Sequence, residues 1–195
     1  MGIAKKPLPA KLVMGFLAKD AALIDEIRPR LCKLYGEELE VLPAFPFKFT
    51  NYYKDEIGEA PVRAFVTYKT LIERESIVDI KLATNDLELE FAKEYGTEGL
   101  RPVNLDPGYM TLGQFFLATT KDQRQRVYIR DGIYVEPTLY FQDGHFHAFP
   151  WTYRDYQSPE YIEFLERVRK QLKRTFTIHN YQLSINNEFG MELLL

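Results

Sequence analysis

The chain has 195 residues, of which 46% are hydrophobic and 27% charged, and its formal net charge at pH 7 is −3. This balance is typical of one globular domain, residues 1–195, and a weakly acidic charge does not suggest non-specific nucleic-acid binding. The single cysteine, Cys32, excludes an intrachain disulfide and fits a reducing compartment. Because no apolar run approaches the length of a membrane span and no signal-peptide core is present, we expect a cytoplasmic protein.

The start of the chain has the pattern of a strand, a helix and a second strand. Residues 1–10 form a basic, proline-bearing arm that we expect to be flexible. The nearly all-apolar run 11–18 predicts a buried, central strand, and Asp20 is placed to cap a helix that Gly36 ends. Residues 38–42 predict a second strand, which completes a β-α-β opening.

Aromatic and helical segments follow this opening. Residues 43–55 carry two prolines and alternating phenylalanines, so we expect an irregular segment with one buried face. Residues 62–68 predict another strand. Residues 73–95 have apolar side chains near helical spacing and predict a helix, which we expect to break at the polar residues 84–86.

The middle of the chain, residues 103–121, combines a strand signal with a turn signal. Residues 106–109, Asp-Pro-Gly-Tyr, are typical of a type II turn. Residues 111–114, Thr-Leu-Gly-Gln, have the pattern of a capping box and predict a helix start. Free amides at such a start attract anions, so an anion site near Asp106 and Tyr109 is one interpretation, and an ordinary turn before a helix is the other.

Two Asp-Gly pairs, at 131–132 and 143–144, stand between strand-like segments and are typical of type I′ hairpins. They predict a three-stranded meander at about 126–130, 133–141 and 145–149. With two-residue loops, Ile129 faces Tyr134 and Val127 faces Glu136.

The meander then separates into an apolar face and a polar face. The apolar face, which includes Tyr128, is expected to join the core. The polar face has the groups to bind a polar ligand and carries Tyr134, Glu136, Thr138, Tyr140, His145 and His147.

The end of the chain predicts a loop, a helix and a tail. Residues 151–156 form an aromatic, polar loop, after which Ser158 and Pro159 begin a final helix. The tail, 175–195, holds the pattern of an extra strand at 175–185. All these elements predict the α+β class: a mixed or largely antiparallel sheet with helices mainly on one face, a β-α-β opening and a C-terminal three-stranded β-meander.

Several short motifs occur together in the chain. They are NLDPGYMT at 104–111, ATTKD at 118–122, GIYVE at 132–136, WTYRDY followed by SPEY, and the earlier FPFKFTNYY and IKLATNDLE. This set, from Lys11 to Arg169, resembles the bacterial and archaeal family called domain of unknown function 4416. The resemblance implies no activity, because the family has no established one. Its members are sometimes labelled GTP-binding, but the chain has no GxxxxGK[ST] phosphate loop to support that label.

Our leading hypothesis is that the protein binds a small anionic or phosphorylated ligand in an aromatic and basic cleft, with processing of that ligand as an open extension of the hypothesis. Asp106 and Glu136 are the acid–base candidates if it is an enzyme, which the sequence leaves open, as it does cofactor and oligomeric state. We expect alanine at Lys121 or Arg126 to weaken phosphate binding with little change in melting temperature. The expected ligand-binding residues are Asn104, Asp106, Tyr109, Thr111, Lys121, Arg126, Glu136, Trp151, Tyr153 and Tyr156.

Two alternatives remain open. The aromatic segments 45–53 and 151–156 are also typical of a non-enzymatic protein-interaction module. The His-x-His pair, His145 and His147, with Glu136 on the neighbouring strand, has the residue types of a metal site, although two surface histidines beside a turn are the commoner explanation.

Overall fold

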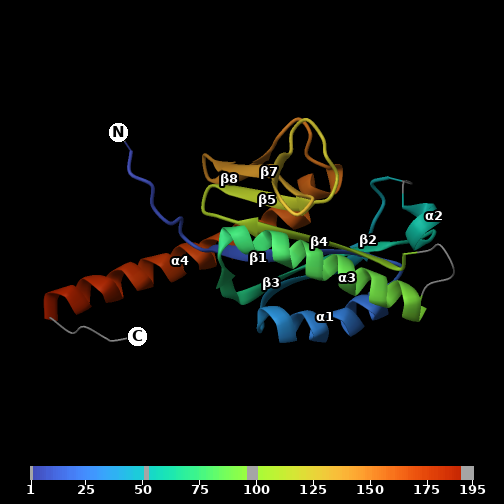
Figure 1. The fold of residues 1–195 in the computed structure, drawn as a ribbon, viewed down its shortest axis with the longest axis horizontal. Coiled ribbons are helices and arrows are strands. Elements are labelled where there is room, and N and C mark those ends of the chain that lie inside the picture. Colours follow the sequence, from blue (N-terminus) through green and yellow to red (C-terminus); the bar gives the residue numbers. More distant parts are fainter. Residues whose placement is uncertain (1, 51–52, 96–100, 190–195) are drawn as a thin grey trace.

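The computed structural model describes residues 2–50, 53–95 and 101–189, without the side chains of Lys54 and 179–189. An eight-stranded sheet forms its centre, in the order β2-β3-β1-β4-β5-β7-β6 with β8 also paired to β7, and every neighbouring pair is antiparallel (Figure 1). The strands are β1 (Ala10–Ala18), β2 (Glu38–Pro46), β3 (Val62–Ile72), β4 (Val103–Met110), β5 (Gln114–Thr119), β6 (Val127–Arg130), β7 (Ile133–Gln142) and β8 (His145–Ala148).

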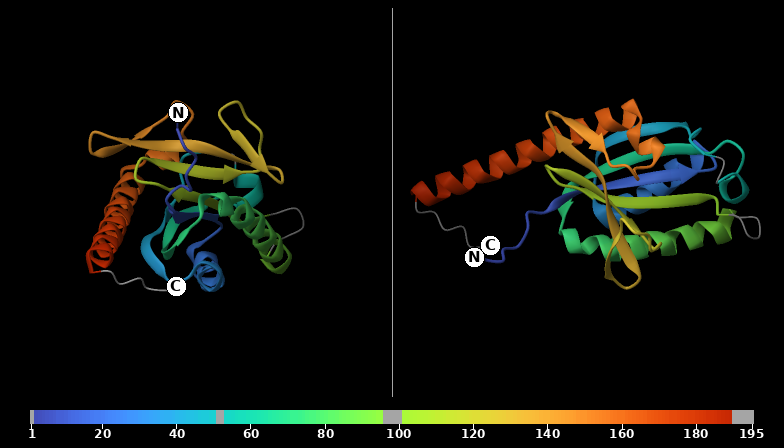
Figure 2. Two further views of the ribbon diagram at one scale, coloured as in Figure 1. Left: turned by 60° about the vertical axis from the view of Figure 1, so that its left-hand side comes forward. Right: turned by 90° about the horizontal axis from the view of Figure 1, so that it is seen from above.

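The helices cover both faces of this sheet (Figures 1 and 2). One core lies between the sheet and α1 and α3, and a second lies between the opposite face and α4. Residues of β1 alternate between the two, because successive side chains of a strand point to opposite faces. The helical elements are α1 (Ala21–Tyr35), α2 (Lys54–Ile57), α3 (Ile77–Tyr95), α4 (Pro159–Phe189) and the short 3₁₀ turns η1 (Arg74–Ser76) and η2 (Arg154–Gln157).

The α+β class and the β-α-β opening are confirmed. β1 is buried and central, the Asp20 side chain accepts a hydrogen bond from the Leu23 amide at the start of α1, and Gly36 ends that helix with a φ of 93°. β1 and β2 both run antiparallel to β3, so they are parallel to each other with β3 between them. The proline-containing β2 lies at the sheet edge, where a missing N–H is tolerated.

The predicted turn at 106–109 and helix start at 111–114 are wrong. Residues 103–110 are strand β4, which pairs along its whole length with β1. Thr111 instead closes a hairpin between β4 and β5: its hydroxyl accepts from the Gln114 amide at 3.1 Å, as in a cap, but no helix follows. Pairing with β1 has therefore overridden a local turn signal.

The three-stranded meander is confirmed, but part of its register is wrong. Tyr140 pairs with His147 as expected. A bulge between Tyr128 and Arg130 moves the other hairpin by one residue, so that Tyr128 rather than Ile129 opposes Tyr134. Tyr128 is exposed and not part of the core. A bulge places two residues against one, which is why a two-residue loop did not set the register.

Two helical predictions are also corrected. α3 runs without the break expected at 84–86, and the Thr84 hydroxyl donates to the Lys81 carbonyl within the helix. The extra strand expected at 175–185 is wrong, because α4 continues to Phe189. No glycine or proline interrupts residues 160–189, so nothing in the chain ends the helix earlier. Figure 1 shows this last part of α4 extending beyond the sheet.

Candidate functional site

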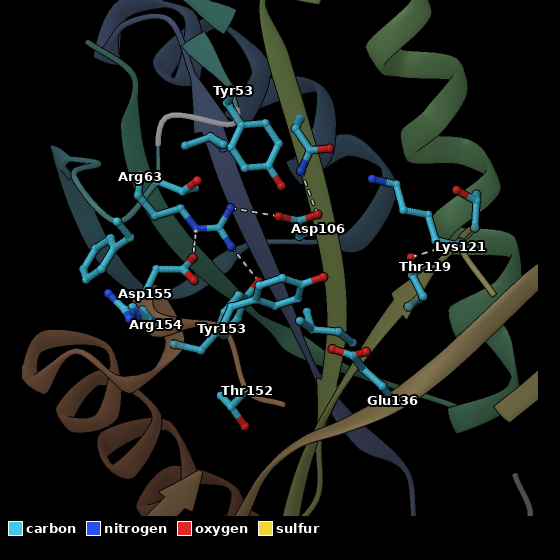
Figure 3. Close-up of a pocket in the computed structure, with 18 of the residues that line it drawn as sticks. Tyr53, Arg63, Asp106, Thr119, Lys121, Glu136, Thr152, Tyr153, Arg154 and Asp155 are labelled. Atoms are coloured by element: carbon cyan, nitrogen blue, oxygen red, sulfur yellow. Dashed lines mark hydrogen bonds and ion pairs between the residues drawn. The ribbon is translucent and has the colours of Figure 1, made fainter. Parts of the chain in front are cut away.

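A pocket of about 630 Å³ opens on the sheet face that α4 also covers. Figure 3 shows Arg63 and Asp155 on one side of it and Lys121 and Glu136 on the other. Its lining residues are Leu17, Phe47, Phe49, Thr50, Tyr53, Arg63, Lys81, Asn85, Arg101, Asn104, Asp106, Leu117, Ala118, Thr119, Thr120, Lys121, Gln123, Arg126, Glu136 and the whole segment 151–156.

The pocket exists because β4 and β5 separate partway along their length. They pair only from Gly108 to Met110, whereas β4 pairs with β1 from Val103 onward. Pro107, the residue just before this pairing begins, has no N–H to donate to a neighbouring strand. At Gly108 the two strands are so close that a Cβ atom would lie 2.4 Å from the Phe116 carbonyl oxygen. A glycine and a proline therefore mark where the strands part.

On the N-terminal side of Pro107, side chains of α3 form hydrogen bonds with the β4 backbone. The Lys81 ammonium donates to the Leu105 carbonyl at 2.8 Å, and the Leu105 amide donates to the Glu88 carboxylate at 2.7 Å. Arg101 donates to the same carboxylate at 2.9 Å. These bonds replace a strand partner, because buried backbone groups must be paired. Burial raises the pKa of Glu88, although Lys81 and Arg101 oppose the shift.

Arg63 on β3 is the centre of a buried cluster. Its guanidinium donates to Asp106 at 2.8 Å and to the Tyr156 hydroxyl at 2.6 Å, and its Nε lies 3.2 Å from Asp155. The side chain is only 3% exposed, and its guanidinium also lies over the Tyr156 ring. Asn104 donates to the other Asp106 oxygen at 2.7 Å. The cluster joins two sheet strands to the 151–156 segment.

Gly15 makes room for this cluster. It lies on β1 between the strands that carry Arg63 and Asp106, and a Cβ atom there would lie 3.0 Å from the Phe65 ring and 3.4 Å from the Arg63 guanidinium. The guanidinium can therefore cross β1 to reach Asp106. An isolated glycine in an otherwise apolar strand is a known sign of such a close approach.

The two carboxylates beside Arg63 differ in acidity. Burial alone would raise the pKa of Asp106, but the positive charges of Arg63 and Lys81 outweigh it and hold that pKa below its usual value. Burial raises the pKa of Asp155, where Arg63 only partly compensates and Asp106 adds repulsion. Asp106 is thus the group that stays ionised, and Asp155 is the one better suited to hold a proton.

A second buried pair, Arg126 and Glu136, lies on the opposite side of the pocket. Their side chains are 3% and 0% exposed, and the Arg126 Nε donates to Glu136 Oε2 at 2.7 Å. The other guanidinium nitrogens donate to the Lys121 carbonyl at 2.9 Å and the Tyr153 hydroxyl at 3.0 Å. Glu136 Oε1 is buried without a hydrogen-bond partner among the described residues. Such an unpaired acceptor costs about 1–3 kcal/mol.

Aromatic side chains form two further walls. Phe47, Phe49 and Tyr53 lie between β2 and α2, and the Phe47 ring contacts those of Phe49 and Tyr53 at centroid distances of 5.5 and 6.1 Å. Trp151 and Tyr153 come from the segment after β8. Trp151 stacks on Phe149 and donates from its indole nitrogen to the Pro137 carbonyl at 2.9 Å, which holds the ring against β7.

The structure brings most of the sequence-predicted ligand residues together. Tyr109 and Thr111 lie outside the pocket: Tyr109 stacks on Phe116 toward the core with α1 and α3, and Thr111 lies in the hairpin turn. The anion-binding helix start proposed there does not exist. The residues that do line the pocket are Asn104, Asp106, Lys121, Arg126, Glu136, Trp151, Tyr153 and Tyr156.

The His-x-His pair is not joined by Glu136. His145 lies 3.1 Å from the Glu166 carboxylate of α4, and His147 lies 3.0 Å from the Gln142 carbonyl and stacks on Tyr140. Within the described part of the chain, no three His, Cys, Asp or Glu side chains are grouped as metal ligands would be.

Sequence reasoning missed Arg63 and Asp155 as site residues. Arg63 is the one charged residue in the apolar run 62–68 of β3, and such a residue is buried only when paired. This charge and Gly15 were the available signals. Asp155 belongs to the aromatic, polar loop 151–156, from which only the aromatic residues were predicted to bind the ligand.

The fold and the pocket together define an α+β protein whose antiparallel sheet carries a cavity of the size that small molecules occupy. The chain belongs to the family described as a domain of unknown function, DUF4416, whose model matches residues 8–172. That range includes every strand of the sheet and ends at Leu172, a buried residue of α4. No curated protein and no solved structure matched the chain. Among the helices described, none has the length and apolar character that crossing a membrane requires.

Proposed function

We propose that the protein binds, in the cytoplasm, a small anionic or phosphorylated ligand in this pocket. One observation carries the proposal: six basic and three acidic side chains line the pocket, and when Glu56 and Glu88, which pair with the lining residues Arg101 and Lys81, are also counted, the formal charge is still +1, in a chain whose formal charge is −3. A concave site that concentrates positive charge attracts anions, and low-dielectric walls strengthen the attraction. The volume of about 630 Å³ and the aromatic walls suit a ligand of metabolite size.

The basic residues have two different roles in this proposal. Arg63 and Arg126 are buried and hold carboxylates, so they shape the pocket. Lys121 and Arg154 are exposed at its lining, where a ligand can reach them. The burial of Arg126 also changes the expectation for its alanine variant, because removing it would leave Glu136 buried without a counter-charge. Lys121 and Arg154 are therefore the residues with which to test binding.

Binding is favoured over the alternatives by geometry. Of the two aromatic segments proposed as a protein-interaction surface, Phe47, Phe49 and Tyr53 from the first and residues 151–156 from the second line one pocket and do not form a flat patch. Asp106 and Glu136, the acid–base candidates, each accept a hydrogen bond from an arginine, which suits a carboxylate that orients groups more than one that exchanges protons. The pocket is thus best explained as a binding site.

A thermal-shift screen against inorganic phosphate, sugar phosphates and nucleotides tests the proposal. We expect at least one phosphorylated compound to raise the melting temperature in a concentration-dependent manner. Lys121→Ala combined with Arg154→Ala should weaken that binding roughly tenfold or more while leaving the ligand-free melting temperature nearly unchanged. Lys33→Ala, an exposed lysine of α1 outside the pocket, is the matched control and should bind normally. Binding that is unchanged in the double variant would refute the proposal.

A further inference from the structure

Glu136 is a pocket residue with a buried carboxylate oxygen that accepts no hydrogen bond from the described residues. Oε2 accepts from Arg126 at 2.7 Å and from the Gln125 side chain at 3.3 Å, while the buried Oε1 accepts from nothing in the described chain. An ionised carboxylate can accept through both oxygens, and buried acceptors without a donor are rare in folded proteins. The unpaired Oε1 atom of Glu136 therefore indicates that a hydrogen-bond donor is missing at this position.

The neighbouring residues do not provide that donor. Each of the three guanidinium nitrogens of Arg126 already has a partner, namely Glu136 Oε2, the Lys121 carbonyl and the Tyr153 hydroxyl. The cross-strand neighbour of Glu136 on β5 is Leu117, which is apolar. Glu136 lines the pocket, and Figure 3 shows its carboxylate beside the hollow and near Tyr153. The pocket is the remaining direction from which a donor can come.

We infer that the ligand carries a hydroxyl or amino group that donates a hydrogen bond to Glu136 Oε1, in addition to the anionic group that the basic residues attract. This inference rests on the proposed function and narrows it to hydroxylated or aminated small anions, such as polyol phosphates. A carboxylate aimed at a second anionic group would repel it, so Glu136 also fixes which end of the ligand enters on its side.

Tyr153 is the exposed neighbour of the Arg126–Glu136 pair that can adjust when the ligand enters. The residue is 48% exposed, and its hydroxyl accepts from the guanidinium that holds Glu136. Because Oε1 is closed to water in the unliganded arrangement, a ligand donor reaches it only after a small movement of the pocket wall. An exposed side chain can change rotamer at little cost, unlike the buried Arg126 beneath it.

Two phosphates of matched size and charge test the inference: glycerol 3-phosphate, which has hydroxyl donors, and n-propyl phosphate, which has none. Dissociation constants measured by calorimetry or NMR titration should favour glycerol 3-phosphate roughly tenfold or more, because a hydrogen bond to a charged acceptor is stronger than a neutral one. In the double variant Arg126→Met with Glu136→Leu, which removes the acceptor together with its buried counter-charge, the preference should fall to about one. Glu163→Gln on the exposed face of α4 is the control and should keep it.

The outcomes separate this inference from the proposed function. If both phosphates bind equally to the unaltered protein, the inference is overturned and anion binding stands. If neither binds, the proposed function fails and the inference falls with it. A preference that survives in this double variant would show that another group accepts from the hydroxyls, which also overturns it. Should the double variant fold poorly, Arg126→Leu with Glu136→Met also removes both buried charges and serves in its place.

Discussion

The buried pair of Arg126 and Glu136 makes a quantitative prediction about stability. Replacing Arg126 by Met keeps most of the side-chain volume and removes the positive charge. Glu136, with 0% exposure, then remains as a buried carboxylate whose only other donor among the described residues is the Gln125 side chain at 3.3 Å. The Lys121 carbonyl and the Tyr153 hydroxyl also lose their donor.

We expect Arg126→Met to lower the free energy of unfolding by about 3–5 kcal/mol, the usual cost of an uncompensated buried charge. For a chain of this length, that corresponds to a fall in melting temperature of roughly 6–20 °C. Urea denaturation followed by circular dichroism measures the free energy, provided that the slope against urea concentration is unchanged between variants.

The double variant Arg126→Met with Glu136→Leu separates a charge effect from a packing effect. Removing both charges should recover most of the loss, because two apolar side chains of similar volume often replace a buried ion pair without cost. A loss below about 1 kcal/mol in Arg126→Met, or a double variant less stable than either single one, would refute this reasoning.

Three further predictions concern other parts of the fold. Gly108→Ala should lower the free energy of unfolding by about 1–3 kcal/mol, because the new methyl group meets the β5 backbone. Gly113→Ala has open space around the new methyl group and should change that free energy by less than about 0.5 kcal/mol. The urea midpoints of the two variants, compared with that of the unaltered protein, measure both effects. Tyr161→Phe removes a buried hydroxyl that has no hydrogen-bond partner among the described residues, and it should leave the melting temperature unchanged or raise it. Tyr156→Phe instead loses a hydrogen bond from the Arg63 guanidinium and should lower the free energy of unfolding by about 1.5–3 kcal/mol. Burial lowers the pKa of Lys11 from 10.5 to about 8, so between these values the unfolded chain binds more protons and stability should rise with pH; a rise that persists in Lys11→Met would contradict this.

Local patterns were sufficient to predict much of the fold. The apolar run of β1, the Asp20 cap and Gly36 end of α1, and the two Asp-Gly hairpins each depend on residues within a few positions of one another. The structure confirms these elements. In the meander, the bulge at Ile129 was not predictable, because it reflects how β6 packs on β7 and not which residues form the loop.

Long-range pairing explains the main error. Ala18 pairs with Val103 and Lys11 with Met110, across 85 and 99 residues of sequence. No local window contains both partners, so the Pro107-Gly108 pair was interpreted as a turn. The same two residues mark the place where β4 and β5 part.

The sequence predicted the position of the candidate site better than the contacts that form it. Asp106 and Lys121 were grouped around a helix start that does not exist, yet both line the pocket. Polar residues in otherwise apolar strands were the useful signal, because burying them requires partners. Which partners they have could not be predicted, since Arg63 reaches Asp106 only across a strand that lies between them in space.

The parting of β4 and β5 has a consequence for motion. The pocket collects residues from both halves of the sheet, with Asp106 before the gap and Lys121 and Glu136 beyond it. A ligand that contacts both sides would link two halves of the sheet that otherwise share few backbone hydrogen bonds at this point. Hydrogen exchange of those amides at 118–120 that face the gap, and not β7, should therefore be rapid in the empty protein and should slow when the pocket is filled.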